Sequence, residues 1–433
     1  MTRRDRNRRD GNSRRPDPRR NDRQSSSVPD SPAARRATLA KLVRGLGVSV
    51  DPLEAEYLAS MFVGPFWSSH PRERDDAASA GLAMIGDIAA QPAADTLALL
   101  RAVATLAALP VADAARAAAV RMRATGVDEP RWAIDIGHPE FAGAWASTDE
   151  FGDQTELVGD FAYPGQEPHA VVTMIDHNFQ GLIRQAMLHP NADQMRATWA
   201  ARTGMAIRRV GAQELADLWA QGLTMLDLYL DPPIDDEVPR LAPLLRSRAR
   251  LLPPAREIPW PEVKAGVRRS LVAQFRRSTH GAGSGSFGGL ARLLVDFKCD
   301  YQDGDPIRWS PILVEIVLAD WIPRKVSLDD DEIDALTGVL RRWIRFAGEK
   351  RGLAEDAIVE ALKAVDTFEP DYQSAMRDPN SAGPAKGLVQ AMREAGIDLT
   401  DKRAINAWIL AFNAMPIEQR DRILGRSTGG TGR

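Results

Sequence analysis

Apolar residues recur at helical spacing along most of the chain, and this periodicity limits the fold more than any other feature. In the range 93–108, for example, Leu97, Leu100, Val103 and Leu106 fall on one face of a helix. We therefore expect an antiparallel helical bundle in the N-terminal part, with helices over residues 34–45, 51–63, 77–91, 93–108 and 112–125.

The spacing changes to alternation in one region, between residues 139 and 177. Three short alternating runs, 142–148, 156–163 and 169–176, are separated by turn-forming residues, which predicts a three-stranded antiparallel meander. Helical spacing returns at residues 179–189 and continues to the end of the chain.

The C-terminal half is predicted to be helical throughout. Pro323 is expected to close the helix over residues 310–321, because proline interrupts the helical hydrogen-bond pattern. The predicted helices cover residues 193–203, 213–230, 235–249, 260–277, 288–297, 310–321, 329–350, 354–377, 384–395 and 400–413.

The predicted fold class is mainly α with a small antiparallel β-meander, an α+β inset within a multi-helix bundle. A length of 433 residues favours more than one domain. We divide the chain into a disordered Arg-rich tail (1–32), an N-terminal helical domain (33–137), the meander with one helix (138–190), a helical segment (191–280), a Gly-rich linker (281–288), a C-terminal helical domain (289–425) and a disordered tail (426–433).

The N-terminal tail is strongly basic. Residues 1–23 hold ten arginines and four aspartates, a net charge of +6, which leaves −9 on the remainder of the chain. So few apolar residues predict disorder. The tail is either a solubilising leader or an electrostatic nucleic-acid contact through residues 3–23. The four aspartates reduce the positive charge of the tail, and no aromatic residue is available for stacking on bases, so the solubilising leader is the favoured interpretation.

Several classes of protein are disfavoured by composition. Cys299 is the sole cysteine, which excludes an intramolecular disulfide and a multi-cysteine metal site built from this chain. The longest apolar run, 311–322, contains Glu315 and Asp320, so no membrane helix is predicted. No apolar stretch follows the paired N-terminal arginines as in a secretory signal. We expect a cytoplasmic protein without a cofactor or a metal.

The densest polar cluster lies where the last predicted strand runs into Asp176, His177 and Asn178. Four of the six histidines fall within residues 138–189. A histidine beside a carboxylate suits a general base, so His177 with Asp176 or Asp160 is the candidate catalytic pair of a hydrolase-like enzyme. Neighbouring strand residues point to opposite faces, however, and the alternative is that Asp176 or Asn178 caps the following helix.

Two other motifs favour structural interpretations. Gly283, Gly285 and Gly288 have the G-x-G-x-x-G spacing of a phosphate loop, but residues 263–278 before them predict a helix where a strand is required, so an interhelical linker is favoured. Cys299 has no identifiable base near it in the sequence and is expected to be a buried structural thiol.

A pair of tryptophans brackets the helix predicted at residues 310–321. Trp309 and Trp321, with Arg324 and Lys325, form a candidate partner-binding surface. The alternative is that the tryptophans anchor helix packing and that the basic residues favour the C-terminal end of the helix.

Two stretches of the sequence carry a family resemblance. The stretch from Asp149 through Asp176-His177-Asn178 and the stretch from Trp309-Ser310-Pro311 to Pro323-Arg324-Lys325 resemble a family of helical proteins from high-GC bacteria with no assigned activity. The resemblance covers most of residues 35–415. It implies a shared helical architecture with a small β insertion, and it transfers no catalytic residue.

These observations favour a non-enzymatic interaction or regulatory protein that binds a protein partner, because no catalytic cluster excludes its structural alternative. A hydrolase-like enzyme with its site at Asp176-His177 is the first alternative. A nucleic-acid-associated protein acting through the Arg-rich tail is the second.

Overall fold

The computed structural model describes residues 51–66, 71–203, 207–259, 261–281, 288–378, 381, 384–398, 400–416, 419, 420 and 423. The helix expected at residues 34–45, both predicted tails, and Gly283 and Gly285 lie outside these ranges. The described residues form two compact units. The first contains the residues up to His138 together with Pro239–Ser247, and the second contains Pro139–Val238 and the residues from Arg248 onward.

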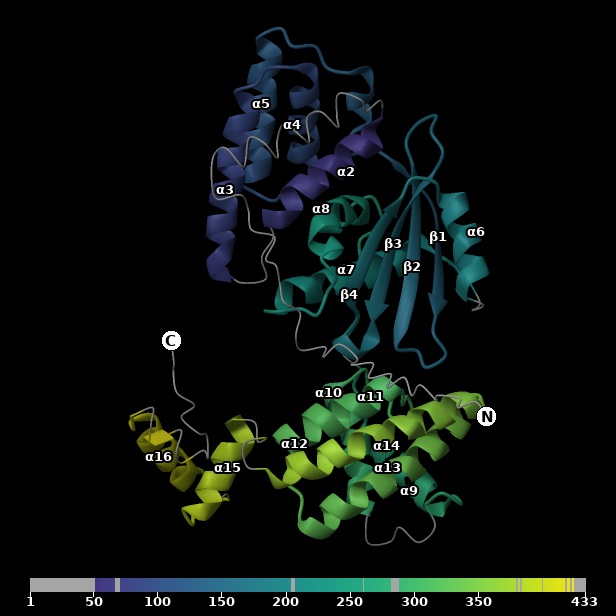
Figure 1. Ribbon diagram of the computed structural model, residues 1–433, viewed down its shortest axis with the longest axis vertical. Helices are drawn as coiled ribbons and strands as arrows, with labels where there is room; N and C mark the ends of the chain where they lie inside the picture. Colours follow the sequence, from purple (N-terminus) through teal and green to yellow (C-terminus); the bar gives the residue numbers. More distant parts are fainter. Residues whose placement is uncertain are drawn as a thin grey trace, which may run out of the picture. The chain divides into compact units, whose positions relative to one another are not determined.

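The first unit is helical, as the N-terminal periodicity predicts, and in it α4 packs against both α2 and α5 (Figure 1). Asp51 caps α2 by accepting a hydrogen bond from the Glu54 amide at 2.9 Å, with Pro52 as the first helical residue. Its elements are α2 (Pro52–Val63), η1 (Gly64–Phe66), α3 (Pro71–Ala89), α4 (Ala94–Leu106), α5 (Val111–Ala124) and η2 (Arg131–Asp135).

The middle of α8 (Glu237–Ala249) belongs to the first unit although it is distant in sequence. The Ser60 hydroxyl donates to the Arg240 carbonyl at 2.8 Å and accepts from the Leu244 amide at 3.1 Å. A side chain at Gly64 would lie 2.5 Å from the Arg240 Cα, so only glycine permits this approach.

The second unit begins with an antiparallel sheet in the strand order β4-β3-β2-β1-β5. The three predicted strands are present, but the helix predicted at residues 179–189 is wrong, because that segment is a fourth strand. Gln180, with a φ of 58°, and Gly181, with a φ of 82°, turn the chain back so that it pairs with β3. Strand bounds are β1 (Glu140–Thr148), β2 (Gln154–Ala162), β3 (His169–Asp176), β4 (Leu182–His189) and β5 (Arg208–Val210).

Helices cover both faces of this sheet (Figure 1). On one face, Trp199 of α6 (Ala192–Thr203) packs against Val158. On the other, Trp219 of α7 (Ala212–Leu228) stacks on Phe161 at 6.1 Å between ring centroids. Val158 and Phe161 are three residues apart on β2 and therefore point to opposite faces.

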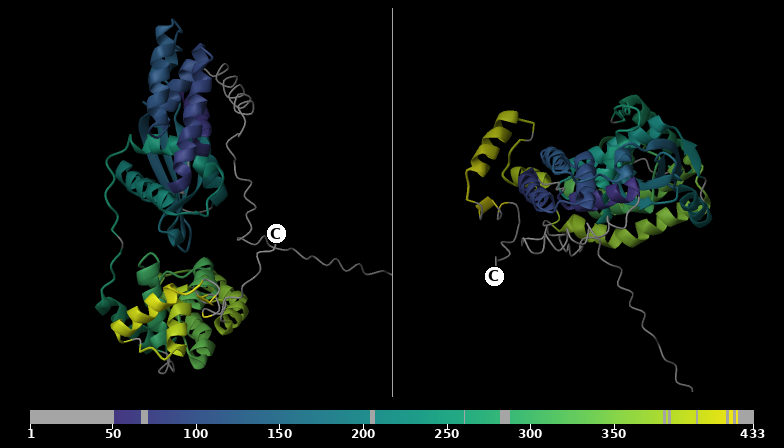
Figure 2. Two further views of the ribbon diagram at one scale, coloured as in Figure 1. Left: turned by 90° about the vertical axis from the view of Figure 1, so that its left-hand side faces the viewer. Right: turned by 90° about the horizontal axis from the view of Figure 1, so that it is seen from above.

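The C-terminal helices of the second unit form a helical cluster (Figure 2). Its core includes Leu294, Leu313 and Trp343. Cys299 is buried at the end of α10, as expected. The helices are α9 (Ala265–Arg277), α10 (Gly288–Tyr301), α11 (Pro311–Glu315), α12 (Ile322–Lys325), α13 (Asp330–Arg351), α14 (Glu355–Arg377), α15 (Pro384–Glu394) and α16 (Lys402–Asn413).

The helix expected to end before Pro323 instead continues to Lys325 through η5, a π-helical segment (Ile316–Trp321). Proline cannot donate to the carbonyl four residues earlier, which interrupts an α-helix. Here the Ile322 amide donates to the Val317 carbonyl, five residues back, so the chain accommodates Pro323 by widening the preceding turn.

The mainly α fold class with a small antiparallel meander is confirmed. Among the helices of the described ranges, none combines the length and the apolar character needed to cross a membrane.

Candidate functional site

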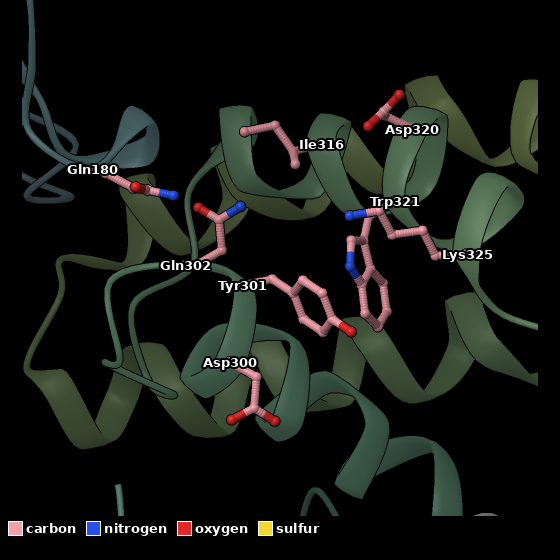
Figure 3. A pocket seen from close by; sticks show the side chains of 8 residues that line it. All are labelled: Gln180, Asp300, Tyr301, Gln302, Ile316, Asp320, Trp321 and Lys325. Atoms are coloured by element: carbon pink, nitrogen blue, oxygen red, sulfur yellow. The ribbon is translucent and has the colours of Figure 1, made fainter. Parts of the chain in front are cut away.

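A pocket of about 290 Å³ lies in the second unit, where the end of α10 faces η5 and α12 (Figure 3). The helical stretch that contains η5 and α12 begins at Ser310, whose hydroxyl caps α11 by accepting a hydrogen bond from the Leu313 amide at 3.2 Å. The lining residues are Gln180, Asp300, Tyr301, Gln302, Ile316, Asp320, Trp321 and Lys325.

The π-helical segment determines which side chains reach the pocket. Its hydrogen bonds span five residues, so Ile316 lies about one turn before the adjacent Asp320 and Trp321, and all three line the same space. Lys325 follows one α-helical turn after Trp321 on the same side. Single-turn π-helical insertions are frequent at functional sites.

Two aromatic rings form one wall of the pocket. Tyr301 and Trp321 meet edge to face at 5.1 Å between centroids, and the ammonium of Lys325 lies 5.0 Å from the Tyr301 ring centroid. Phe297 supports Trp321 from the core at 4.8 Å. Trp321 is 7% exposed and Tyr301 is 49% exposed, so a fixed ring supports an accessible one.

Two buried polar atoms at this pocket have no hydrogen-bond partner within the described part of the chain, the indole nitrogen Nε1 of Trp321 and the amide oxygen Oε1 of Gln302. The two residues are 7% and 8% exposed. An unpaired buried polar group costs roughly 1–3 kcal/mol, so such groups are usually satisfied by protein, water or a ligand. Both atoms have almost no solvent-accessible surface, so a ligand that used this donor and this acceptor would have to displace the side chains that cover them.

The two carboxylates that line the pocket are each paired with an arginine. Asp300 accepts from Arg268 at 2.6 Å, and this hydrogen bond holds the pKa of Asp300 below its usual range. Asp320 pairs with Arg324 at 2.8 Å. No carboxylate of the described residues lies within 4.0 Å of the Lys325 ammonium. The positive charge of Lys325 is thus the one that a ligand would neutralise.

A buried ionic network lies next to Gln302 and holds the pocket in place. Lys298, fully buried, pairs with Asp303 at 2.5 Å, and burial lowers the pKa of Lys298 to about 8. Arg308 donates to Asp303 at 2.5 Å, to Asp153 in the β1–β2 turn, and to the Asn178 amide oxygen at 2.8 Å. These bonds connect the 302–309 loop to the segment that contains Gln180, so two pocket residues are positioned together.

The candidate catalytic residues His177 and Asp176 lie outside the pocket lining. His177 Nε2 shares a 2.9 Å hydrogen bond with the Thr155 hydroxyl, and burial together with Arg308 lowers the pKa of His177. The fully buried Asp176 accepts from the Asn178 amide at 2.9 Å and from Arg184 at 3.0 Å. Asp176 therefore caps a three-residue 3-10 turn (His177–Phe179) and not the predicted helix, which is absent, while a catalytic role for the pair stays a prediction.

The other members of the central polar cluster have separate partners. Asp160 pairs with Arg196 on the α6 face of the sheet. His169 accepts from Arg248 at 3.3 Å, and His189 Nδ1 lies 2.7 Å from the Asn191 carbonyl oxygen. His280 pairs with Glu349 at 2.9 Å. Among the described residues, no three or more His, Cys, Asp or Glu side chains form a group suited to a metal ion.

The four candidate partner-binding residues do not lie on one common surface. Trp321 and Lys325 line the pocket, and the exposed Arg324 lies beside it. Trp309 is 2% exposed and donates to the Pro306 carbonyl at 3.0 Å, so it packs in the core. Sequence reasoning did not identify Tyr301 or Gln302, because the predicted helix ended at residue 297 whereas α10 continues to Tyr301.

Burial keeps the single thiol of the chain protonated. Cys299 is 1% exposed, and desolvation raises its pKa to about 11, so it stays protonated at neutral pH.

Comparison with known proteins identifies no relative: no protein-family model, no curated protein and no solved structure matches this chain. The resemblance to helical proteins of high-GC bacteria stays a prediction, and the site rests on its own geometry.

Proposed function

We propose that this chain is a non-enzymatic binding protein with an interaction or regulatory role, and that its pocket between α10 and η5 recognises a small carboxylate ligand. The observation that carries the proposal is the pair of buried, unpartnered atoms, Trp321 Nε1 and Gln302 Oε1, beside the unpaired charge of Lys325.

The pocket chemistry selects the ligand class. Lys325 and the Trp321 N–H both favour a carboxylate, because each donates to oxygen. The free oxygen of Gln302 accepts a hydrogen bond and so requires an N–H or O–H on the ligand. The exposed face of Tyr301 offers an apolar contact. A molecule with a carboxylate and a nearby amide N–H, such as an N-acylated amino acid or a peptide C-terminus, meets these requirements.

Binding without catalysis is supported by the state of the acidic residues at the pocket. Asp300 is engaged by Arg268, and a carboxylate whose pKa is held low is a weak general base. Asp320 is engaged by Arg324. Both carboxylates orient arginines around the pocket, which leaves Lys325 as the charge directed at the ligand.

The test is a calorimetric titration of the full chain with N-acetyl-L-alanyl-L-alanine and with its C-terminal amide. The free acid should bind and the amide should bind far more weakly, because the amide lacks the charge that Lys325 and Trp321 recognise. Trp321→Phe and Lys325→Met should each weaken binding of the acid roughly tenfold or more, since each removes one hydrogen bond to a charged group.

Matched controls distinguish the pocket from a general loss of structure. Trp343 is another buried tryptophan with an unpartnered indole nitrogen, but it lies in the core away from the pocket, so Trp343→Phe should leave affinity unchanged. Lys363→Met changes an exposed lysine of α14 and should have no effect. Equal affinity for acid and amide, or no binding of either, would contradict the proposal.

A further inference from the structure

A second cavity, of about 510 Å³, lies wholly within the first unit and is lined by basic side chains. Arg101 comes from α4, Arg123 from the last turn of α5, and Arg131 from η2. His138 also lines this cavity. Its volume falls within the range of pockets that bind small molecules, roughly 300–1,000 Å³.

The cavity has more positive than negative charge. Glu129 is the one carboxylate that lines it, and it pairs with Arg101 at 2.5 Å and with Arg123 at 3.6 Å. No carboxylate of the described residues forms an ion pair with Arg131. Three guanidinium groups around one carboxylate repel one another, and a bound anion would relieve that repulsion.

This excess of positive charge is local. Residues 24–433 carry a net charge of −9, so the cavity contrasts with the rest of the chain outside the basic tail. Asp128 lies directly before the lining residues of the 129–138 segment and Asp135 lies among them, so acidic residues interrupt the basic ones along this segment. A continuous nucleic-acid backbone would require an uninterrupted basic track.

Apolar side chains also line the cavity, among them Ala133, the exposed Ile134 and the buried Ile136. Guanidinium groups together with a few apolar side chains suit a small molecule with several negative charges on a short carbon skeleton.

We propose that this cavity binds a small polyanion, either a polycarboxylate or a polyphosphate, through Arg101, Arg123 and Arg131. Guanidinium groups bind both kinds of anion in a bidentate manner. The site is separate from the carboxylate pocket of the second unit and rests on different residues.

The experiment titrates the full chain with inorganic pyrophosphate and, in a separate arm, with citrate. Binding of pyrophosphate alone identifies a phosphate site, binding of citrate alone identifies a carboxylate site, and binding of both supports the shared chemistry. The double variant Arg123→Ala, Arg131→Ala should weaken binding roughly tenfold or more, because two charged hydrogen-bond donors are lost.

Two further variants make the result specific. Arg121→Ala removes an exposed arginine of the same helix that does not line the cavity, so affinity should not change. Glu129→Gln removes the competing carboxylate and should tighten binding, an effect that a purely structural role for Glu129 would not produce. Equal weakening by Arg121→Ala, weaker binding by Glu129→Gln, or no binding of either anion would overturn the proposal.

Discussion

Arg248 is a buried cation that is stabilised by its neighbours on the sheet. It donates to the Tyr163 hydroxyl at 2.9 Å and to His169 Nε2 at 3.3 Å, and its guanidinium lies 5.8 Å from the Phe161 ring centroid. Because His169 accepts from a cation, its ring must remain neutral. Burial and the Arg248 charge together lower the pKa of His169 to about 3.

This shift makes stability depend on pH. In the unfolded chain His169 takes up a proton near its ordinary pKa of 6.5, whereas in the folded protein it does so near 3. The stabilising contribution is therefore complete above pH 6.5 and is lost as the pH falls towards 3, with a loss of about 2 kcal/mol by pH 5. His169→Gln should show a shallower decrease in the free energy of unfolding between pH 6 and pH 4, measured with urea.

His169→Gln is expected to be less stable than the unmodified protein at neutral pH. The quantity to compare is therefore the slope of the free energy of unfolding against pH, and not its absolute value. His177, whose pKa is also lowered, is present in both proteins and contributes equally to both slopes. Identical slopes for the two proteins would show that His169 is not held neutral.

At the scale of elements, the 302–309 loop is attached to the sheet through Arg308. Its side chain is 2% exposed and contacts Asp303, Asp153 and Asn178. The desolvation cost of burying these charges is offset by their mutual attraction and hydrogen bonds, and removing one partner leaves the others buried without compensation.

Arg308→Met should therefore lower the free energy of unfolding of the second unit by about 3–5 kcal/mol, because the buried Asp153 and the partly buried Asp303 each lose a counter-charge. Arg324→Met breaks the exposed pair with Asp320 and should cost less than about 1 kcal/mol. Urea unfolding followed by far-UV circular dichroism measures both. Equal losses for the two variants would mean that the Arg308 network adds no more than a surface pair.

Most elements were predictable from sequence because they have strong local signals. The Asp51-Pro52 start of α2 and the Ser310-Pro311 start of α11 are examples, and both caps are present. The β4 strand was not predictable, because Leu182, Ile183 and Ala186 also fit one face of a helix and the outcome depends on pairing with β3. The π-helical turn before Pro323 has no distinct sequence pattern.

The candidate site was predictable only in part, because some of its residues come together only through tertiary contacts. Trp321 and Lys325 stand out as an aromatic and a cation at the end of a helix. Gln302 and Gln180 come from segments more than 100 residues apart in the chain, and they reach one pocket through the Arg308 contacts. Such convergence depends on tertiary structure, which local spacing does not encode.

At the scale of the whole molecule, the chain has two compact units, and each contains a polar pocket with a free cation among its described residues. In the second unit this is Lys325, and in the first it is Arg131. The first unit is completed by Pro239–Ser247, which shows that the two units are not simply successive stretches of sequence. If both proposals hold, each unit contains its own anion-binding pocket, and the two can be tested separately because they share no residue.

The central claim is that the Trp321 indole N–H is kept free for a carboxylate ligand, and nuclear magnetic resonance of the indole N–H groups tests it most directly. The chain has ten tryptophans, and the Trp321 signal is identified by its loss in Trp321→Phe. Adding N-acetyl-L-alanyl-L-alanine should shift the Trp321 signal and leave the Trp343 signal in place. An unchanged Trp321 signal at ligand saturation, or equal shifts of both signals, would contradict the account.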